Sequence, residues 1–345
     1  MSMYTYSEAR LCPVCDSENR RLRYTYQYLN LVRLEITKCL SCGTYYVPRP
    51  LAEEFLAKYY EAYYKIDGPL QGNPLIIARD TISAEKRRNT FLANLPPAFN
   101  HWGTWLDVGC GSGAMLKNMG NLFEHSIGIE PSEASVKFAT STLGLKVKHG
   151  FLLEGSFPHA SFDLITFFDV LEHVINPKHL LLVASRLLKP EGWVLITTVN
   201  MHSFYRTISG KYWRFFTPLQ HLTYFHSDAL IMVLESCSFH NFTVYSSTRE
   251  DIHPAVPLIN ILKAKAIYNE IHSIEEARLA HVLGKSEGEI LIQQTPFNQK
   301  INNARSRSFY KMIIGVIASP IEQLVGVVTN LIGRTDGLWV WAQKK

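Results

Sequence analysis

Four cysteines near the start of the chain have a spacing that could bind a metal ion. Cys12 and Cys15 form one Cys-x-x-Cys pair, and Cys39 and Cys42 form a second. Thiolates in two such knuckles give the closed tetrahedral site that is typical of structural zinc. The interval between the pairs is longer than usual, but it accommodates a hairpin. We therefore expect a small zinc ribbon without a catalytic water; two coincidental redox pairs are the alternative.

A glycine-rich loop, LDVGCGSG at residues 106–113, could bind a nucleotide-like cofactor. Glycines let the backbone turn tightly and approach a ligand in front of a helix N-terminus. Gly109, Gly111 and Ala114 also satisfy the G-x-G-x-x-G/A pattern of dinucleotide-binding proteins. A nicotinamide enzyme therefore has to be considered.

Two carboxylates beside this loop bear on the choice of cofactor. Asp107 lies two residues before the first glycine, where it would repel a pyrophosphate but suits an amino-acid ammonium group. Glu130 ends the next expected strand, where an acid can accept hydrogen bonds from a ribose diol. The position of Glu130 fits NAD and an adenosyl ligand equally. The choice therefore depends on Asp107, which favours the adenosyl ligand.

Hydrophobic patterning predicts the elements that position these residues. Between Thr104 and Thr248, short apolar runs alternate with helix-length segments, which indicates a parallel sheet covered by helices on both faces. The runs are TWLDVG, SIGIE, LKVKH, FDLITFF, GWVLITTV and FTVYSST. Helices are expected to begin at Pro131-Ser132, Asn176-Pro177 and Ser227-Asp228.

Together these motifs resemble those of the class I S-adenosylmethionine-dependent methyltransferases. LDVGCGSG is similar to the first motif of that superfamily, GIEPS to its acidic second-strand end, and FDLITFFDVLEHVINP to its fourth-strand motif. RLLKPEGWVLITTVN is similar to its fifth strand, and FTPLQHLTYFHSDALIMVLESCSF resembles a bacterial small-molecule branch that includes ubiquinone-biosynthesis O-methyltransferases. The cysteine knuckles followed by VPRP resemble the N-terminal module of some members of that branch. The resemblance implies a doubly wound, mostly parallel seven-stranded Rossmann-like α/β sheet with a small N-terminal zinc ribbon.

The resemblance also implies which residues bind S-adenosyl-L-methionine. They are Asp107, Gly109, Gly111, Gly113, Glu130, Phe151, Leu152, Phe168 and Asp169. Glu130 would hold the ribose hydroxyls, and Phe151 with Leu152 would lie along the adenine. Phe168 and Asp169 would pass beneath the methionine part, where a carboxylate and an aromatic face stabilise a sulfonium cation. Family members often have an acid where this chain has Phe151, so its adenine contacts would be apolar.

Three residues are candidates for the acceptor side. His173 follows the fourth strand of the superfamily, and His221 lies in TPLQHLTYF after the fifth. Either could accept a proton from an acceptor hydroxyl, and His221 is the expected base. Tyr224 could orient the same hydroxyl. A histidine that only orders its loop is the alternative for both positions, because methyl transfer requires no protein nucleophile.

We therefore expect methyl transfer to a small-molecule or glycan-type acceptor, with a hydroxyl as the methylated group. An RNA methyltransferase is the alternative, since the zinc ribbon and RSRSFYK could serve RNA; DNA is not expected. A non-catalytic cofactor-binding scaffold is a second alternative. The Asn-Pro-Pro-Tyr motif for base amines and the Pro-Cys pair for cytosine C5 are absent from the sequence.

Composition is that of a folded globular protein with a sizeable core, and it excludes disorder, collagen and a disulfide miniprotein. The chain has 345 residues, 47% hydrophobic and 19% charged, and a net charge of +5 that by itself implies neither nucleic acid nor a membrane as partner. Its first residues lack a signal pattern, and we expect a cytoplasmic protein. Cys110 and Cys237 stand apart and are expected to be buried.

The pattern predicts five segments, a division in which the zinc ribbon has its own source of stability. They are a zinc ribbon at 1–50, a helical segment at 51–100, the cofactor-binding core at 101–248, a helical insertion or cap at 249–332 and a final core strand at 333–345. The apolar run 312–332 is interrupted by Pro320 and Glu322, so two short helices are expected and no transmembrane span. Peripheral membrane contact through 309–332 is the alternative.

Overall fold

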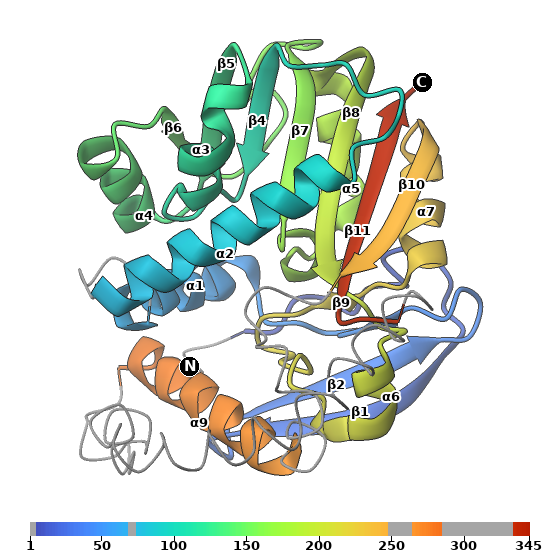
Figure 1. Cartoon of the computed structure of the whole chain (residues 1–345). Helices are drawn as coiled ribbons and strands as arrows, with labels where there is room; N and C mark the ends of the chain where they lie inside the picture. The colour runs from blue at the N-terminus through green and yellow to red at the C-terminus, as the bar shows by residue number, and fades with distance from the viewer. Residues whose placement is uncertain (1–4, 68–73, 248–263, 285–333) are drawn as a thin grey trace, which may run out of the picture.

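A computed structural model describes residues 5–67, 74–247, 264–284 and 334–345 of the chain. It contains a seven-stranded sheet with helices on both faces and a four-stranded sheet beyond one edge of it (Figure 1). The parallel strands of the large sheet point their carboxyl ends toward the small sheet. Ligands of open α/β sheets bind at this edge.

The large sheet has the strand order β10-β11-β8-β7-β4-β5-β6. Its strands are β4 (Thr104–Val108), β5 (His125–Glu130), β6 (Val147–His149), β7 (Phe162–Phe168), β8 (Leu188–Val199), β10 (Phe239–Ser247) and β11 (Gly337–Lys344). Neighbours from β8 to β6 are parallel, whereas β11 is antiparallel to both β8 and β10. The predicted fold class, a mostly parallel seven-stranded Rossmann-like sheet, is confirmed.

Helices and short helical turns connect these strands. They are α1 (Glu53–Asp67), α2 (Pro74–Ala93), α3 (Ala114–Met119), η2 (Gly120–Leu122), α4 (Glu133–Lys137), η3 (Phe138–Thr142), η4 (Leu171–His173), α5 (Pro177–Leu187), α6 (Phe204–Ser209), η5 (Gly210–Tyr212), α7 (Ser227–Ser236) and α9 (Ala264–Val282). Ser132 and Asn176 cap α4 and α5 as their sequence positions predict. The cap of α7 is His226, one residue before the predicted Ser227.

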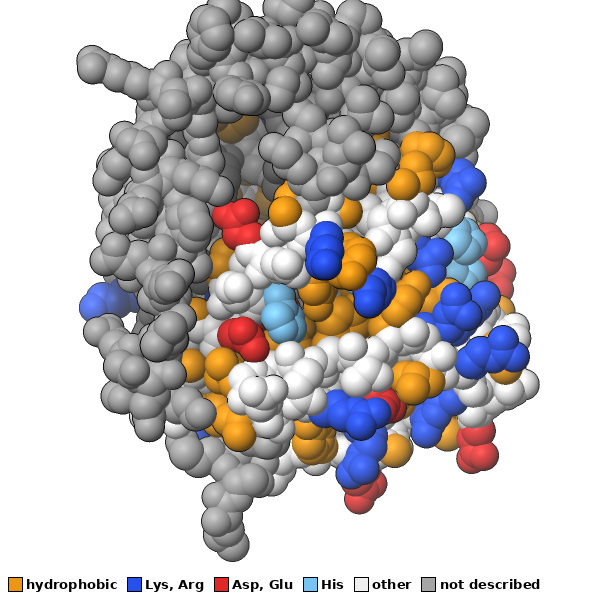
Figure 2. Space-filling model, turned by 90° about the horizontal axis from the view of Figure 1, so that it is seen from below, with side chains coloured by type: hydrophobic (Ala, Val, Ile, Leu, Met, Phe, Trp, Pro, Cys, Tyr) orange, Lys and Arg blue, Asp and Glu red, His pale blue; other side chains and the backbone are white. Residues whose placement is uncertain are grey.

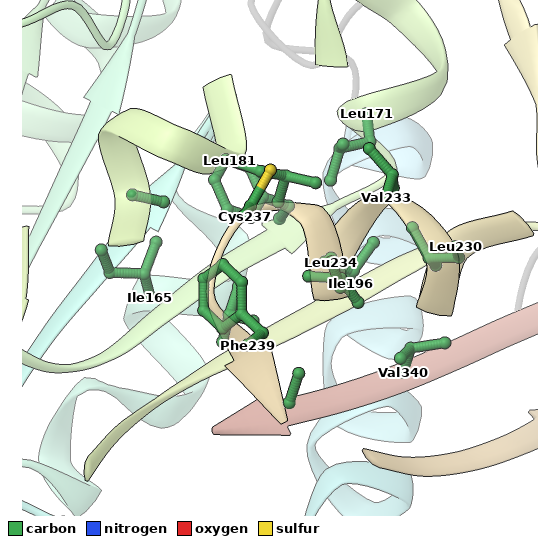
Figure 3. Close-up of a cluster of buried hydrophobic side chains, with 14 of the residues drawn as sticks. Ile165, Leu171, Leu181, Ile196, Leu230, Val233, Leu234, Cys237, Phe239 and Val340 are labelled. Atoms are coloured by element: carbon green, nitrogen blue, oxygen red, sulfur yellow. The ribbon is translucent and has the colours of Figure 1, made fainter. Parts of the chain in front are cut away.

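Two hydrophobic layers hold the helices against the sheet because successive strand residues face opposite sides. On one face, Ile196 of β8 and Val340 of β11 pack with Leu181 of α5 and Leu234 of α7 (Figure 3). The other face carries the large aromatic side chains Trp105, Trp193, Trp339 and Trp341, which share one cluster with Phe91 of α2 and with residues of α3. Both faces of the central strands are therefore buried, which explains their continuous apolar runs.

The small sheet joins the N-terminal segment to the rest of the molecule. Its order is β1-β2-β3-β9, with β1 (Arg20–Tyr28), β2 (Val32–Cys39), β3 (Tyr45–Tyr46) and β9 (Thr223–Tyr224). The β1–β2 hairpin is the one that the interval between the cysteine pairs predicts. Tyr45 pairs with Tyr224 and Tyr46 with Thr223, so one strand of this sheet comes from the core segment.

Further contacts cross the same junction. Cys12, Val14 and Cys39 pack in one hydrophobic cluster with residues of α7, and Tyr28 and Leu34 share another with α1 and α9. The Arg10 guanidinium donates hydrogen bonds to the carbonyl oxygens of Val47 (2.9 Å), Ile175 and Leu222. The expectation that the zinc-binding segment has a separate source of stability is therefore wrong, because strand pairing and shared cores tie it to the large domain.

Parts of the predicted C-terminal region lie outside the described residues. Of the 249–332 segment the structure describes only residues 264–284, which hold α9; the two apolar helices and the 309–332 membrane contact fall outside. Among the described residues, no helix is both long and apolar enough to cross a membrane.

The junction yields a stability prediction. Arg10→Ala removes the donor shared by three backbone carbonyls of the junction, and we expect the free energy of unfolding to fall by about 2–4 kcal/mol. Arg21→Ala is the matched control because Arg21 is exposed on β1, and it should change stability by no more than about 0.5 kcal/mol. Chemical denaturation of both variants measures the difference. Equal stabilities would show that Arg10 does not join the two parts.

Candidate active site

The glycine loop lies between β4 and α3, and its backbone conformation explains its glycines. Gly109, Gly111 and Gly113 all have positive φ, at 67°, 54° and 83°. A Cβ on Gly109 would come within 2.7 Å of Val170, and one on Gly113 within 2.5 Å of Leu145. These two glycines are thus required by the packing of the protein itself, in addition to any close approach of a ligand.

Glu130 is built into this loop. Its side chain is only 2% exposed, with Oε2 accepting a hydrogen bond from the Gly111 N–H and Oε1 one from the Ser132 N–H, both at 2.9 Å. Burial raises the pKa of Glu130, and the two backbone hydrogen bonds partly oppose this rise. Each carboxylate oxygen has two acceptor positions, so the fixed carboxylate keeps capacity for a pair of ligand hydroxyls.

Asp107 is buried at the end of β4, where a chain of hydrogen bonds fixes it. Trp105 Nε1 donates to Thr166 Oγ1 at 2.9 Å, and Thr166 Oγ1 donates to Asp107 Oδ1 at 2.7 Å. Burial raises the pKa of Asp107 to about 7, while Thr166 and the charge of Arg87 oppose the rise. A cationic ammonium group beside this carboxylate would restore its ionised form.

Arg87 of α2 is a site residue that the sequence patterns did not indicate. Its Nη2 lies 2.5 Å from Asp169 Oδ2, and both side chains are less than 20% exposed. Asp169 follows β7 with a φ of 56°, and its backbone N–H donates to the Thr197 carbonyl of β8. The cofactor edge thus contains a cation besides its carboxylates, and no motif marks it because it comes from a separate helix.

The other predicted cofactor residues occupy different environments. Phe168 is buried at the end of β7, and Leu152 is 5% exposed, whereas Phe151 is 58% exposed. A flat ligand group could lie against Phe151, because an exposed aromatic face is available to it. The assignments of these residues to the cofactor stay predictions.

His173 and His221 lie close together beyond the end of β7. Their positions along the chain did not predict this proximity. Their ring centroids are 4.8 Å apart, and potential ligand atoms of Glu172, His173 and His221 all lie within 4.8 Å of one another. Tyr60 of α1 donates from its hydroxyl to the Gln220 carbonyl at 3.0 Å and lies 3.1 Å from His173 Nδ1. Two imidazoles and a carboxylate at this spacing could move a proton or hold a divalent cation.

Backbone carbonyls set the orientation of both imidazoles. His221 Nδ1 lies 2.9 Å from the Phe215 carbonyl oxygen, and His173 Nδ1 lies 3.0 Å from that of Gln220. A carbonyl only accepts, so each Nδ1 carries the proton when the ring is neutral. Nε2 is then the nitrogen that can accept a proton.

Tyr224 does not face an open site. It is completely buried, its ring packs edge-on against Phe216, and its centroid is 6.1 Å from that of His221. Burial raises the pKa of Tyr224 well above the usual value. Tyr224 therefore packs near His221 in the interior, and its role toward the acceptor stays a prediction.

Glu275 of α9 is a second residue that the sequence did not indicate. It is 1% exposed, accepts a hydrogen bond from the Tyr28 hydroxyl at 3.0 Å and lies 3.4 Å from Gln220 Nε2. Burial raises the pKa of Glu275 to about 8, although Tyr28, Arg278 and Gln220 oppose this. Glu275 thereby connects α9 to Gln220, the residue that directly precedes His221.

The four N-terminal cysteines converge as their spacing predicts. Cys12 and Cys42 have their Sγ atoms 3.5 Å apart, as do Cys15 and Cys39, and all four lie within 4.8 Å of one another. A tetrahedral zinc with bonds of about 2.3 Å requires sulfur separations of about 3.8 Å. The hydrogen bond between Cys12 and Cys42 raises the pKa of Cys12 and lowers that of Cys42. This cluster fits a structural zinc ion.

His226 connects the knuckle to the core. Its Nε2 lies 3.0 Å from the Cys42 carbonyl oxygen, and its Nδ1 accepts a hydrogen bond from the Ala229 N–H as the cap of α7. Lys178 of α5 also forms an ion pair of 2.8 Å with Asp16 between the knuckles. The segment that carries the four cysteines is thus attached to α5 and α7 by these contacts.

A glycine loop and a buried second-strand acid at the carboxyl edge of this sheet define a Rossmann-like cofactor-binding fold. Comparison with known proteins agrees. Residues 82–244 match the family described as "Methyltransferase domain". The predicted resemblance is confirmed.

Curated relatives match over part of this region. The ubiquinone biosynthesis O-methyltransferase of Maricaulis maris is 36% identical over 118 residues, which are 31% of this chain and 46% of that protein. The protein of the same name from Thiobacillus denitrificans is 34% identical over 28% of this chain and 45% of its own length. The chain thus spans less than half the length of these relatives. A SAM-dependent methyltransferase structure from Archaeoglobus fulgidus has a TM-score of 0.46 and 18% identity, covering 83% of this chain and 99% of that one.

We predict one tightly bound zinc ion per chain. Elemental analysis should find zinc in the wild type, and Cys→Ser changes at Cys12, Cys15, Cys39 or Cys42 should reduce it because each removes one thiolate ligand. Cys237→Ala is the control, since Cys237 is buried in the core near α7. Metal removal should also increase amide exchange in β9, which pairs with β3. Zinc that persists after loss of two ligands would contradict the assignment.

Glu275 predicts a pH dependence of stability. Because its pKa is raised from 4.5 to about 8, the folded state holds a proton that the unfolded state releases. The free energy of unfolding should therefore fall as pH rises from about 4.5 to 8, by at most about 1.4 kcal/mol per pH unit from this group. Glu275→Gln should flatten the curve, and Glu270→Gln, on the exposed side of α9, should not. Denaturant titrations across this range test it; parallel curves for all three proteins would exclude the effect.

Proposed function

We propose that this protein transfers a methyl group from S-adenosyl-L-methionine to a hydroxyl of a small-molecule or glycan-type acceptor. The observation that carries the proposal is the buried Glu130 carboxylate, fixed by the Gly111 and Ser132 N–H groups at the glycine loop of a methyltransferase domain. The names of the curated relatives, ubiquinone biosynthesis O-methyltransferases, support methylation of an oxygen.

The described residues fit the proposed cofactor. S-adenosyl-L-methionine supplies an electrophilic methyl group on a sulfonium cation. Glu130 would accept hydrogen bonds from the ribose hydroxyls. Asp107 would face the ammonium group, whose positive charge would favour the ionised carboxylate. Arg87 brings a positive charge to the same edge, where the methionine carboxylate needs a partner. Phe168, the last residue of β7, and Asp169, which follows it, would lie beneath the methionine part.

The proximity of His173 and His221 supports a proposed role on the acceptor. His173 belongs to η4, which directly follows β7, and His221 lies against it. Removal of the hydroxyl proton makes the oxygen a better nucleophile, and Nε2 of His221 is the acceptor nitrogen of the neutral ring. Aligning the oxygen with the methyl group supplies much of the remaining rate. Tyr60 and the Gln220 carbonyl fix the neighbouring His173.

The first test concerns the cofactor. Glu130→Ala should weaken S-adenosyl-L-methionine binding by roughly 1–3 kcal/mol, because charge-assisted hydrogen bonds to the ribose are lost. Glu133→Ala is the control, since Glu133 is exposed on α4 three residues away. Calorimetry with S-adenosyl-L-methionine and with NADH measures both proteins and the wild type. Binding of NADH alone would overturn the proposed cofactor, and an unchanged affinity in Glu130→Ala would overturn the role of Glu130.

The second test concerns the base. His221→Ala should lower turnover at least tenfold while S-adenosyl-L-methionine affinity stays unchanged. In the wild type, turnover should decrease when the pH drops below the pKa of the histidine, because the protonated ring cannot accept a proton. His159→Ala, at an exposed site, is the control. Radiolabelled methyl transfer to a panel of hydroxylated metabolites and nucleotide sugars provides the assay. Full turnover in His221→Ala would leave His221 as a loop-ordering residue, and loss of cofactor binding would place it on the cofactor side.

One observation favours RNA as a second candidate acceptor. Arg20, Arg21 and Arg23 are exposed on the edge strand β1, and Figure 2 shows Lys and Arg side chains gathered on the face that lies below the small sheet in Figure 1. Phosphate contacts from such a surface would make RNA affinity fall steeply with salt concentration. A small-molecule acceptor would not have this property.

A further inference from the structure

The helix α9 carries a buried carboxylate that the proposed reaction does not use. Glu275 is 1% exposed, and its helix lies outside residues 82–244, which match the methyltransferase family. An ionised side chain is costly to bury unless hydrogen bonds compensate it. The partners of Glu275 therefore indicate what this carboxylate holds in place.

The helix α9 is attached to the β1–β2 hairpin and to α1, and it lies beside both in Figure 1. The Leu29 N–H, at the end of β1, donates to Glu276 Oε1 at 2.7 Å. The Arg278 guanidinium lies over the ring of Tyr63 in α1, 4.5 Å from its centroid. These contacts hold the helix in place independently of Glu275.

Glu275 joins this helix to the segment that carries His221. Its Oε2 accepts a hydrogen bond from the Tyr28 hydroxyl at 3.0 Å, and its Oε1 accepts one from Gln220 Nε2 at 3.4 Å. Tyr28 is completely buried, so its hydroxyl holds the carboxylate in one orientation. The other carboxylate oxygen is thereby directed at the Gln220 amide.

Gln220 connects the carboxylate to both histidines of the proposed acceptor site. Its N–H donates to the Thr217 carbonyl at 2.8 Å, and its own carbonyl accepts from the Tyr60 hydroxyl and lies 3.0 Å from His173 Nδ1. His221 is the next residue, and its N–H donates to the same Thr217 carbonyl at 2.8 Å. A shift of Gln220 would therefore move the carbonyl that orients His173 and the backbone of His221.

The segment around Gln220 needs such an anchor. Residues 213–222, all of which the structure describes, connect η5 to β9 without a helix or strand. Contacts from other elements therefore have to set the position of this segment. Position matters for an in-line methyl transfer, because a displacement of about 1 Å can lower a rate about 100-fold.

We propose that Glu275 is a positioning residue of the acceptor site, which holds Gln220 and through it the imidazoles of His173 and His221. The inference rests on the proposed function for the task of the histidines. Glu275 acts through Gln220 and not on the reacting atoms. The helix α9 is then a part of the acceptor site, although it lies outside the residues that match the family.

Methyl-transfer kinetics of matched variants test the role. Glu275→Ala removes the acceptor of the Gln220 amide, and Gln220→Ala removes the same contact from its other end should the first variant fail to fold. Glu276→Ala is the control on the same helix, because Glu276 binds the Leu29 N–H. We expect kcat to fall by about tenfold or more in the first two variants, with the KM for S-adenosyl-L-methionine within about twofold of wild type, and no such loss in Glu276→Ala. The double variant should lose no more than either single variant, since both remove one contact.

Imidazole ¹⁵N NMR of the S-adenosylhomocysteine complex gives a second measurement that needs no acceptor. In the wild type, the neutral rings of His173 and His221 should be protonated at Nδ1, since both Nδ1 atoms face carbonyl oxygens. In Glu275→Ala and Gln220→Ala, the His173 signals should shift toward a mixture of the two tautomers, because the Gln220 carbonyl is no longer held. Glu276→Ala should keep the wild-type signals.

The outcomes separate positioning from simple attachment of α9. Equal losses in Glu275→Ala and Glu276→Ala would show that only the attachment matters and would overturn the proposal. Wild-type kcat and wild-type histidine signals in Glu275→Ala would overturn it as well. If the wild type transfers no methyl group to any acceptor, the proposed function fails, and the NMR signals of the variants still decide whether Glu275 positions the histidines.

Discussion

The pairing of β3 with β9 is the interaction on which the acceptor side of this molecule depends. It consists of two residue pairs, yet it joins the cysteine-containing segment to a strand that follows the core strand β8. Through it the small sheet covers the carboxyl edge of the large one, and α1 brings Tyr60 to His173 (Figure 1). So short a pairing is marginal alone, which explains why Arg10, the shared hydrophobic clusters and the cysteine cluster reinforce it.

The two sides of the proposed site are built in different ways. On the cofactor side, the backbone holds the functional groups: Gly111 and Ser132 fix Glu130, and the loop conformation itself requires glycine at 109 and 113. On the acceptor side, residues of separate segments meet, with His173 after β7, His221 before β9 and Tyr60 on α1. A fixed cofactor loop beside a composite acceptor wall lets one fold serve different acceptors by changing the wall.

Buried charge is concentrated where these segments meet. Asp107, Glu130 and Glu275 are almost fully buried, and burial raises the pKa of each. Each carboxylate is nevertheless hydrogen-bonded, to Thr166, to two backbone N–H groups and to Tyr28 respectively. Such groups cost stability unless a partner or ligand compensates them, so buried acids of this kind are typical of functional regions.

The sequence alone determined the elements whose information is local. The glycine loop, the acid at the end of β5, the cysteine pairs and the strand runs are spacings within short segments, and their structures follow from backbone sterics, ligand geometry and burial of alternating side chains. Order along the chain even located β11 as a final strand, although not its antiparallel place between β8 and β10.

Only the tertiary structure decided which residues far apart in the sequence come into contact. Arg87 with Asp169, Glu275 with Gln220, and Tyr60 with His173 join residues from different elements. The same holds for the cysteine-containing segment, whose spacing suggested a separate unit, because its strand β3 pairs with β9 of the core segment. These contacts depend on strand register and helix packing, and a spacing pattern carries no information about either.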